Sequence, residues 1–193
     1  MTLDERAPII IADAGPLIRL AAAGLLESLR GLNRRIVLVD RVEDEVVGDP
    51  EKPFAGEVAG WIERMGPSIE RARTVEGYGI EALRSEAATP EARALLKRRL
   101  RDSGERAIRE FIEGFEPEDV GTAIVVYEDR DTPALMAAAR VPLTLMTTRR
   151  FARIVNEWGV NVDAVAALEA IAGRYDLKPA AVMEIEPAGP ASK

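Results

Sequence analysis

Short apolar runs alternate along this chain with longer stretches in which apolar residues recur at helical spacing. Continuous apolar runs of four or five residues are typical of strands that helices cover on both faces, as in a parallel sheet. Strands that alternate with helices predict an α/β fold with right-handed crossovers. The expected strands are Ile9 to Ala12, Ile36 to Val39, Ala123 to Tyr127, Pro142 to Met146 and a brief edge strand at Ala181 to Ile185.

Helix signals fill the intervals between these runs. Pro16 suits the first turn of a helix after the first strand, and Thr89 followed by Pro90 suits the start of another. Ser103 has the side chain of a third helix cap. The segment 51–100 is therefore predicted to be mainly helical and polar.

The length of 193 residues and a hydrophobic content of 47% are enough for one sizeable core. We expect a single domain over residues 1–178, with a helical insertion at about 51–100 and a loose C-terminal tail at 179–193. No apolar run approaches the ~20 residues of a membrane span, and the amino terminus lacks the basic flank of a signal peptide. These features favour a cytoplasmic protein without membrane contact.

Cysteine and histidine are both absent. Their absence excludes disulfides, thiolate zinc sites, cysteine nucleophiles and imidazole general bases. Any chemistry must therefore use carboxylates, hydroxyls, Lys, Arg or a bound ion, and oxygen ligands favour Mg²⁺, Mn²⁺ or Ca²⁺. The net charge of −7 argues against a broadly basic nucleic-acid surface but does not exclude a local basic groove.

Four acids stand at the ends of predicted elements: Asp13, Glu45, Glu105 and Asp129. Open α/β sheets place their ligands at the carboxyl ends of their strands, so these side chains are expected to meet there. Taken singly, each acid also has a structural explanation, such as a helix cap for Asp13 or Asp129 and a favourable helix start for Glu105. Taken together, they would repel one another unless a divalent cation neutralised them.

The motifs around these acids, with two later stretches, resemble the PIN-domain ribonucleases over roughly residues 9–171. The motifs are Asp13-Ala14-Gly15-Pro16-Leu17-Ile18, Val42-Glu43-Asp44-Glu45-Val46, Gly104-Glu105-Arg106-Ala107-Ile108, Tyr127-Glu128-Asp129, Met146-Thr147-Thr148-Arg149-Arg150-Phe151 and Trp158-Gly159-Val160. The resemblance implies a three-layer α/β/α sandwich around a central, mainly parallel sheet of four to five strands. It also implies a metal-dependent endoribonuclease that leaves a 5′-phosphate.

Carried over position by position, the resemblance implies an acidic pocket that binds Mg²⁺ or Mn²⁺. Asp44 and Glu128 are expected to point away from it, because adjacent residues diverge by about 100° on a helix and 180° on a strand. The implied catalytic residues are Asp13, Glu45, Glu105 and Asp129, and the implied metal ligands are Asp13, Glu105, Asp129 and, as an auxiliary, Asp131.

Substrate contacts are expected from Thr148, Arg149 and Arg19. The sequence favours a helix cap over a substrate contact for Thr148, and surface arginines are commonly only solvated. The resemblance also implies a toxin of a toxin–antitoxin pair, with RNA as substrate, a small antitoxin as partner and a homodimer as the assembly. Trp61 suits either a dimer interface or the core. A PIN-like scaffold that binds protein or RNA without cutting is the alternative function.

Two other classes that gather acids at strand ends fit less well. A receiver domain would place an acid pair after the first strand and a lysine after the last, but Ala14 follows Asp13 and Met146-Thr147-Thr148-Arg149 contains no lysine. A haloacid-dehalogenase-like phosphatase would place a second acid at the position of Gly15. Both classes are therefore set aside.

Overall fold

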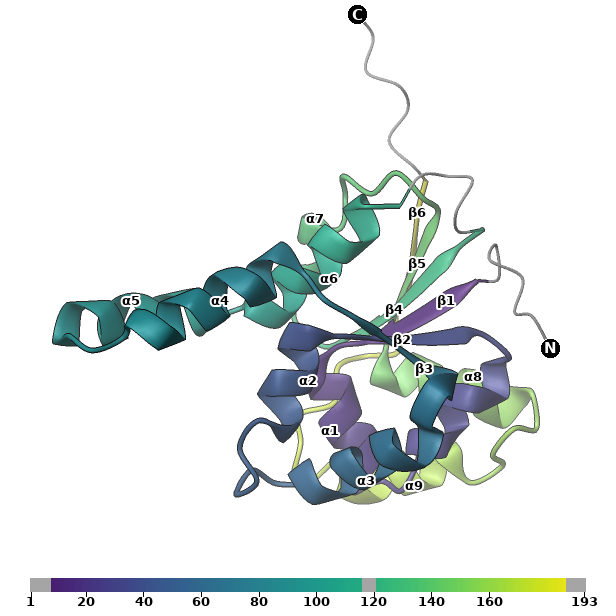
Figure 1. Cartoon of the computed structure of the whole chain (residues 1–193). Coiled ribbons are helices and arrows are strands. Elements are labelled where there is room, and N and C mark those ends of the chain that lie inside the picture. Colours follow the sequence, from purple (N-terminus) through teal and green to yellow (C-terminus); the bar gives the residue numbers. More distant parts are fainter. Residues whose placement is uncertain (1–7, 116–120, 187–193) are drawn as a thin grey trace, which may run out of the picture.

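The computed structural model describes residues 8–115 and 121–186. Within these residues the chain forms an α/β fold with one six-stranded sheet (Figure 1). The strands are β1 (Ile9–Ala12), β2 (Arg35–Val39), β3 (Ile69–Ala72), β4 (Ala123–Tyr127), β5 (Leu143–Thr147) and β6 (Val182–Ile185). The helices are α1 (Ala14–Ala22), η1 (Leu26–Leu32), α2 (Asp40–Val47), α3 (Ala55–Met65), η2 (Gly66–Ser68), α4 (Val75–Glu86), α5 (Pro90–Leu100), α6 (Ser103–Glu113), α7 (Thr132–Leu135), α8 (Thr148–Glu157) and α9 (Ala164–Ile171).

The central strands are parallel and almost entirely buried. The strand order is β3-β2-β1-β4-β5-β6, and only β6 runs antiparallel to its neighbour. Ile10 of β1 pairs with Ile36 of β2 on one side and with Ile124 of β4 on the other. Burying an isoleucine side chain in such a strand contributes roughly 1.5–3 kcal/mol. The continuous apolar runs therefore form the parallel sheet that their pattern predicts.

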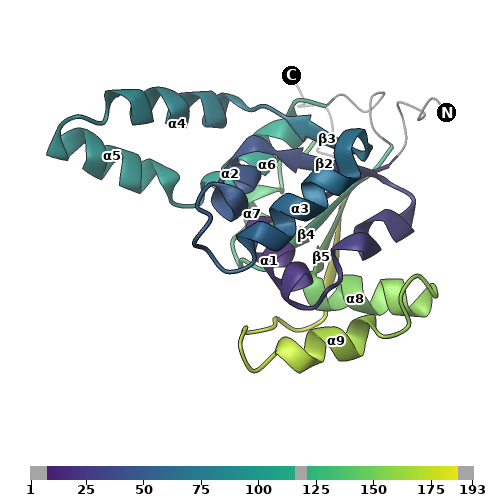
Figure 2. The ribbon, with the colours of Figure 1, turned by 60° about the horizontal axis from the view of Figure 1, so that its bottom comes forward.

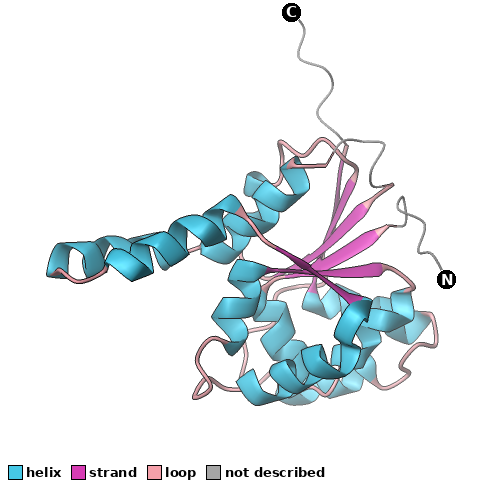
Figure 3. Ribbon diagram, viewed as in Figure 1, coloured by secondary structure: helices cyan, strands magenta, loops and turns pink. Residues whose placement is uncertain are grey.

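Helices cover both faces of the sheet, so the chain forms three layers. Helices α1, α3, α8 and α9 lie together on one face, and α6 and α7 lie on the other (Figures 1 and 3). The expectation of an α/β sandwich with a mainly parallel sheet is confirmed at this level. No helix in the described part of the chain is long and apolar enough to cross a membrane.

The strand order reverses direction between β1 and β4. From β1 the chain passes outward to β2 and β3, then returns to β4 on the other side of β1 and continues to β5. In an open α/β sheet, the crevice outside the carboxyl ends of the two strands at such a switch point is where ligands bind. Asp13 directly follows β1, and Glu128 and Asp129 directly follow β4. The topology thus brings these acids to one edge of the sheet.

Strand β3 was not among the strands expected from the sequence. The segment Ile69–Ala72 was expected to belong to a helical region, but it extends the sheet beside β2. Its two middle residues are exposed and polar, because β3 is an edge strand. The described sheet has six strands instead of the expected four to five. The expected edge strand near the carboxyl end is confirmed as β6, which pairs with β5, and residues 187–193 of the predicted tail lie outside the described residues.

Helices α4 and α5 form an antiparallel arm that extends from the body of the molecule (Figure 2). Thr89 caps α5 by accepting a hydrogen bond from the backbone N–H of Ala92, and Pro90 is the first helical residue, as predicted. The turn between the helices forms the tip, and the end of α5 returns to the body where α6 begins (Figure 2). The arm therefore places residues 97–101 next to the first turn of α6.

The start of α6 differs from the expected cap. Asp102, with a left-handed backbone (φ 54°), occupies the cap position, and Ser103 is the first helical residue. Ser103 is buried, and its Oγ accepts hydrogen bonds from Arg41 Nε at 3.3 Å and Nη2 at 3.2 Å. The hydroxyl therefore joins α6 to α2 instead of capping its own helix.

Candidate functional site

A cleft of about 520 Å³ lies at the carboxyl ends of β1 and β4. Five carboxylate side chains and three cationic side chains line this cleft, so it can bind both a cation and a phosphate group. The residues that line it are Asp13, Gly15, Arg19, Glu105, Glu128, Asp129, Arg130, Asp131 and Lys178. We refer to this site as the carboxylate cleft.

Asp13 is the most buried of the predicted catalytic acids, with 9% of the residue exposed. Its backbone N–H donates to Val126 O at 3.0 Å, which fixes it between β1 and β4. Its side chain occupies the cap position of α1 but makes no capping hydrogen bond. The pKa of Asp13 is raised to about 6, mainly by burial; a hydrogen bond with the Ala14 backbone lowers it, and the charges of Glu45 and Asp129 contribute to the rise. A helix cap does not account for this carboxylate.

Glu105 stands in the first turn of α6 and enters the cleft from the opposite layer. Burial of its side chain is the main cause that raises its pKa to about 7, and the charges of Asp13, Asp129 and Asp102 add to the effect. A favourable helix start alone would hold the pKa of this carboxyl down. The structure therefore shows a carboxylate that competes with its neighbours for a proton or a cation.

Glu45 lies beside the cleft, on α2, and its residue is exposed. A methyl group at Gly104 would lie 3.2 Å from Asp13 Oδ1 and 3.3 Å from Glu45 Oε2. The two carboxylates thus face the same point on the α6 backbone. Desolvation is the largest cause that raises the pKa of Glu45, while Lys52 and Arg41 lower it. Glu45 does not itself line the cleft that contains Asp13 and Glu105.

Asp129 and Asp131 form the exposed rim of the cleft after β4. Asp129 Oδ1 accepts a hydrogen bond from the Asp131 backbone N–H at 2.8 Å, which fixes a tight turn before α7. The Asp131 side chain makes no capping bond to α7. Asp129 Oδ2 and the Asp131 carboxylate therefore have no hydrogen bond within the described residues.

Glu128 lines the cleft together with Asp129, which corrects the expectation that it would point away. The strand ends at Tyr127, so the alternation of side chains in a strand no longer holds for the next two residues. Glu128 is 7% exposed, and its Oε1 accepts from the Thr148 backbone N–H at 3.3 Å and lies 3.8 Å from Arg19 Nη1. Its buried Oε2 has no hydrogen-bond partner.

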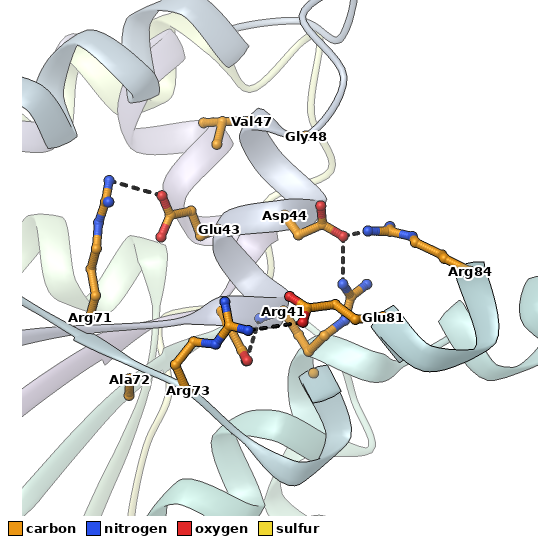
Figure 4. A pocket seen from close by; sticks show the side chains of 12 residues that line it. Arg41, Glu43, Asp44, Val47, Gly48, Arg71, Ala72, Arg73, Glu81 and Arg84 are labelled. Atoms are coloured by element: carbon orange, nitrogen blue, oxygen red, sulfur yellow. Dashed lines mark hydrogen bonds and ion pairs between the residues drawn. The ribbon is translucent and has the colours of Figure 1, made fainter. Parts of the chain in front are cut away.

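Asp44, in contrast, lies away from the carboxylate cleft, as expected. It lines a separate cavity of about 380 Å³ between α2, β3 and α4, which Figure 4 shows. Its Oδ2 accepts from Arg41 at 2.5 Å and from Arg84 at 2.6 Å, which holds the arm against α2. The arginines of this cavity are paired with its acids through Arg41–Asp44, Arg84–Asp44, Arg71–Glu43 and Arg73–Glu81. The pairs leave no excess charge in this cavity for a ligand.

The three predicted substrate contacts have different surroundings. Arg19 lines the cleft, where it also donates to Asp176 O at 3.0 Å. Arg149 forms an ion pair with Glu169 on α9 and is not among the residues that line the cleft. Thr148 is completely buried, and its Oγ1 has no hydrogen-bond partner.

Thr147, and not Thr148, caps α8. Thr147 Oγ1 accepts a hydrogen bond from the Arg150 backbone N–H at 3.3 Å. The structural explanation offered for Thr148 is therefore wrong. The Thr148 backbone instead supports Glu128 in the cleft, which makes Thr148 a positioning residue for that carboxylate.

Two cationic residues of the cleft, Arg130 and Lys178, were not predicted from the sequence. Arg41 was not predicted either; it is 4% exposed and lines the separate cavity beside α2. The charge pattern of the sequence carried no signal for Lys178, which reaches the cleft from the segment before β6. Arg41 follows the β2 strand within a run of charges that reads as an exposed helix face.

No three acidic side chains in the described ranges form a ready-made metal-binding group in this structure. Mg²⁺ usually keeps several waters and binds through only one or two carboxylates, so it does not require such a group. The unpaired Glu128 Oε2 and the raised pKa values of Asp13 and Glu105 fit a site that gains from a nearby cation.

Comparisons of the chain with protein-family models, with curated proteins and with solved structures found no match. The PIN-domain resemblance therefore stays a prediction from the motifs.

Proposed function

We propose that this chain is a divalent-metal-dependent endoribonuclease that hydrolyses RNA phosphodiesters, with PIN-like architecture. The observation that carries the proposal is the convergence of Asp13, Glu105 and Asp129, which come from three separate elements, on one cleft. The cleft lies at the switch point of the sheet, where α/β folds bind ligands. The order of the PIN-like motifs along the sequence supports the same assignment.

The position of each carboxylate in the fold determines the role proposed for it. Asp13 and Asp129, which follow adjacent strands, would hold Mg²⁺ or Mn²⁺ directly or through water, with Asp131 as an auxiliary ligand. Such a cation acidifies a bound water and stabilises the charge that develops on a phosphodiester. Glu105 would add a further ligand to the cation, and Glu105 and Glu45, which approach from helices, would orient the attacking water and accept its proton.

The cationic side chains of the cleft would bind the phosphate group that is cleaved. Arg19, Arg130 and Lys178 stand beside the carboxylates and would hold the phosphate and its leaving oxygen. Arg19 is already oriented by Asp176 O and by Glu128, so less side-chain entropy is lost when it binds phosphate. Glu128, supported by Thr148, would act as a positioning residue for Arg19.

A cleavage assay tests the proposal. End-labelled total RNA is incubated with the purified chain and Mn²⁺ or Mg²⁺, and the products are mapped for 5′-phosphate ends. We expect cuts that require the cation and that Asp13→Asn reduces at least about a hundredfold. The matched control is Asp163→Asn, an exposed acid before α9, which should cut like the wild type. Cation-dependent binding without any cut would support the non-cleaving alternative, and equal cuts by both variants would indicate a contaminating nuclease.

We also propose a toxin role in a cytoplasmic toxin–antitoxin pair, with a homodimeric chain. An antitoxin arginine placed in the carboxylate cleft would offset the repulsion between Asp13 and Glu105 as a metal does. Trp61 of α3 does not serve the dimer, because it is completely buried in the core. Co-expression with the neighbouring reading frame, followed by size-exclusion chromatography, tests both the partner and the assembly.

A further inference from the structure

The last turn of α5 is a cluster of positive charge on a chain with a net charge of −7. Lys97, Arg98 and Arg99 end the helix, and Arg101 follows it. We call these four residues the basic turn. Helix α5 has no buried residue, so this turn is presented to solvent along its length. Basic side chains in the last turn of a helix interact favourably with its dipole, which accounts for Lys97, Arg98 and Arg99. Arg101 lies beyond the helix end, so the dipole does not account for it.

Most of the basic turn has no acidic partner. Arg99 pairs with the buried Glu76 at 2.7 Å. The side chains of Lys97, Arg98 and Arg101 form neither a hydrogen bond nor an ion pair within the described part of the chain and are exposed. Exposed, unpaired cations that are grouped on one turn attract a polyanion such as a nucleic-acid backbone.

The basic turn also borders a hollow of about 260 Å³. Leu95, Arg98, Arg99 and Arg106 line it, which combines three guanidinium groups with an apolar surface. Leu95 is 40% exposed although it is a leucine. Guanidinium planes with an apolar floor suit both the phosphates and the stacked bases of a single strand.

The root of the arm holds this hollow in place. Arg106 donates to Glu76 Oε1 at 2.8 Å and to Arg101 O at 2.8 Å. Glu110 Oε2 accepts the Glu76 backbone N–H at 2.8 Å, which fixes the start of α4 on α6. Because this network joins the start of α4 and the end of α5 to α6 through the buried Glu76, the hollow does not depend on the free tip of the arm.

The hollow and the carboxylate cleft are lined by adjacent residues on the first turn of α6. Glu105 lines the cleft, and Arg106, the next residue, lines the hollow. An RNA strand bound in the hollow would therefore pass to the cleft around the first turn of α6.

We propose that the basic turn and the hollow of the α4–α5 arm bind the RNA backbone and deliver the strand to the carboxylate cleft. This inference rests on the proposed function, because the cleft defines where the strand is cut. The occupant is single-stranded RNA, since its charge is complementary to the basic turn and its bases are free to stack.

The experiment measures binding separately from cleavage. A fluorescent 20-nucleotide poly(U) RNA is titrated with the full chain in EDTA, and the salt dependence of the affinity is recorded. The test variant is Lys97→Gln/Arg98→Gln/Arg101→Gln. The matched control is Arg30→Gln/Arg64→Gln/Arg174→Gln, which removes the same charge from exposed positions outside the arm. Circular dichroism checks that both variants fold, and single Arg98→Gln serves if the triple variant does not.

We expect the test variant to bind poly(U) roughly tenfold or more weakly, with the slope of log K against log salt reduced by about 2, and the control to bind like the wild type. Equal binding by all three proteins would overturn the inference, whether or not they cut RNA. Arm-dependent binding without any metal-dependent cut would leave the inference standing and overturn the nuclease proposal. Binding of polyglutamate in place of poly(U) would assign the arm to an acidic protein and overturn the inference.

Discussion

The Asp13 and Glu45 carboxylates face one point on the α6 backbone, the Cα of Gly104. A methyl group there would lie 3.2 Å from Asp13 Oδ1 and 3.3 Å from Glu45 Oε2, closer than most side-chain contacts. Gly104→Ala would place an apolar group between two carboxylates and take water away from both. We expect it to raise their pKa values further and to weaken Mn²⁺ binding at least about tenfold.

The same substitution at Gly56 provides the control. Gly56 is the second residue of α3, as Gly104 is of α6, and a methyl group there meets nothing within 4 Å. Gly56→Ala should stabilise the fold by up to about 1 kcal/mol through helix propensity, with Mn²⁺ affinity unchanged. Calorimetric Mn²⁺ titration of both variants makes the comparison, and equal affinities would show that Gly104 is not beside the site.

The raised pKa values of Asp13 and Glu105 predict how stability depends on pH. Their pKa values are about 6 and about 7, so the folded chain retains protons that the unfolded chain releases. The free energy of unfolding from these two groups is therefore largest near pH 4 and falls as the pH rises through about 6 to 7. Replacing both residues, as Asp13→Asn/Glu105→Gln, should remove this fall. Chemical denaturation across the range measures the difference between the two proteins.

Divalent cations should reverse that trend. Mn²⁺ binds the deprotonated carboxylates, so its stabilising effect grows with pH over the range in which Asp13 and Glu105 lose their protons. Thermal melting should show a gain in Tm with Mn²⁺ at about pH 8 that is much smaller at about pH 5. A gain of equal size at both pH values would argue against these two acids as ligands.

Asp44 is predicted to act in structure alone. It accepts from the buried Arg41 and from Arg84 of the arm, so Asp44→Ala leaves Arg41 with only Ser103 as a side-chain partner. A buried charge that loses its partner costs about 3 kcal/mol. Urea denaturation should show this loss, while the gain in Tm with Mn²⁺ stays. If Asp44→Ala also abolished the gain in Tm with Mn²⁺, Asp44 would have to be one of the residues that bind the cation.

The two tryptophans lie in different environments, one in the core and one at the surface. Trp61 of α3 is completely buried, whereas Trp158 is 61% exposed. Trp61→Ala should cost about 3–5 kcal/mol of unfolding free energy, and Trp158→Ala about 0.5 kcal/mol or less. Urea denaturation at two protein concentrations checks this. If the loss of unfolding free energy in Trp61→Ala depended on protein concentration, Trp61 would belong to a dimer interface.

The sequence was sufficient to predict the buried elements of the fold. Strands β1 and β4 begin and end where their apolar runs do, because a strand covered on both faces leaves no position for a polar residue. Strand β3 was missed because its burial neither is continuous nor alternates: Glu70 and Arg71 are exposed between the buried Ile69 and Ala72. Four residues of this kind carry no pattern that separates a strand from a helix.

The site was predictable where it depends on strand ends. Asp13 and Asp129 were predicted because each follows an apolar strand; they lie at the same edge because β1 and β4 are adjacent and parallel, and that strand order was not predicted from the sequence. Glu128 was misplaced because the backbone turns after Tyr127, and the direction of a side chain in a turn does not follow from periodicity. Lys178 reaches the cleft through tertiary packing of the segment before β6, which no local pattern encodes.

Calorimetric titration with Mn²⁺ tests most directly whether the carboxylate cleft holds a cation. The wild type is compared with Asp129→Asn and Glu105→Gln, and with the controls Asp163→Asn and Glu113→Gln, the second of which lies on the same helix as Glu105. The account predicts saturable Mn²⁺ binding in the wild type and both controls, and a loss of affinity of at least about tenfold in both cleft variants. Equal affinity in all five proteins, or no binding in the wild type, would contradict it.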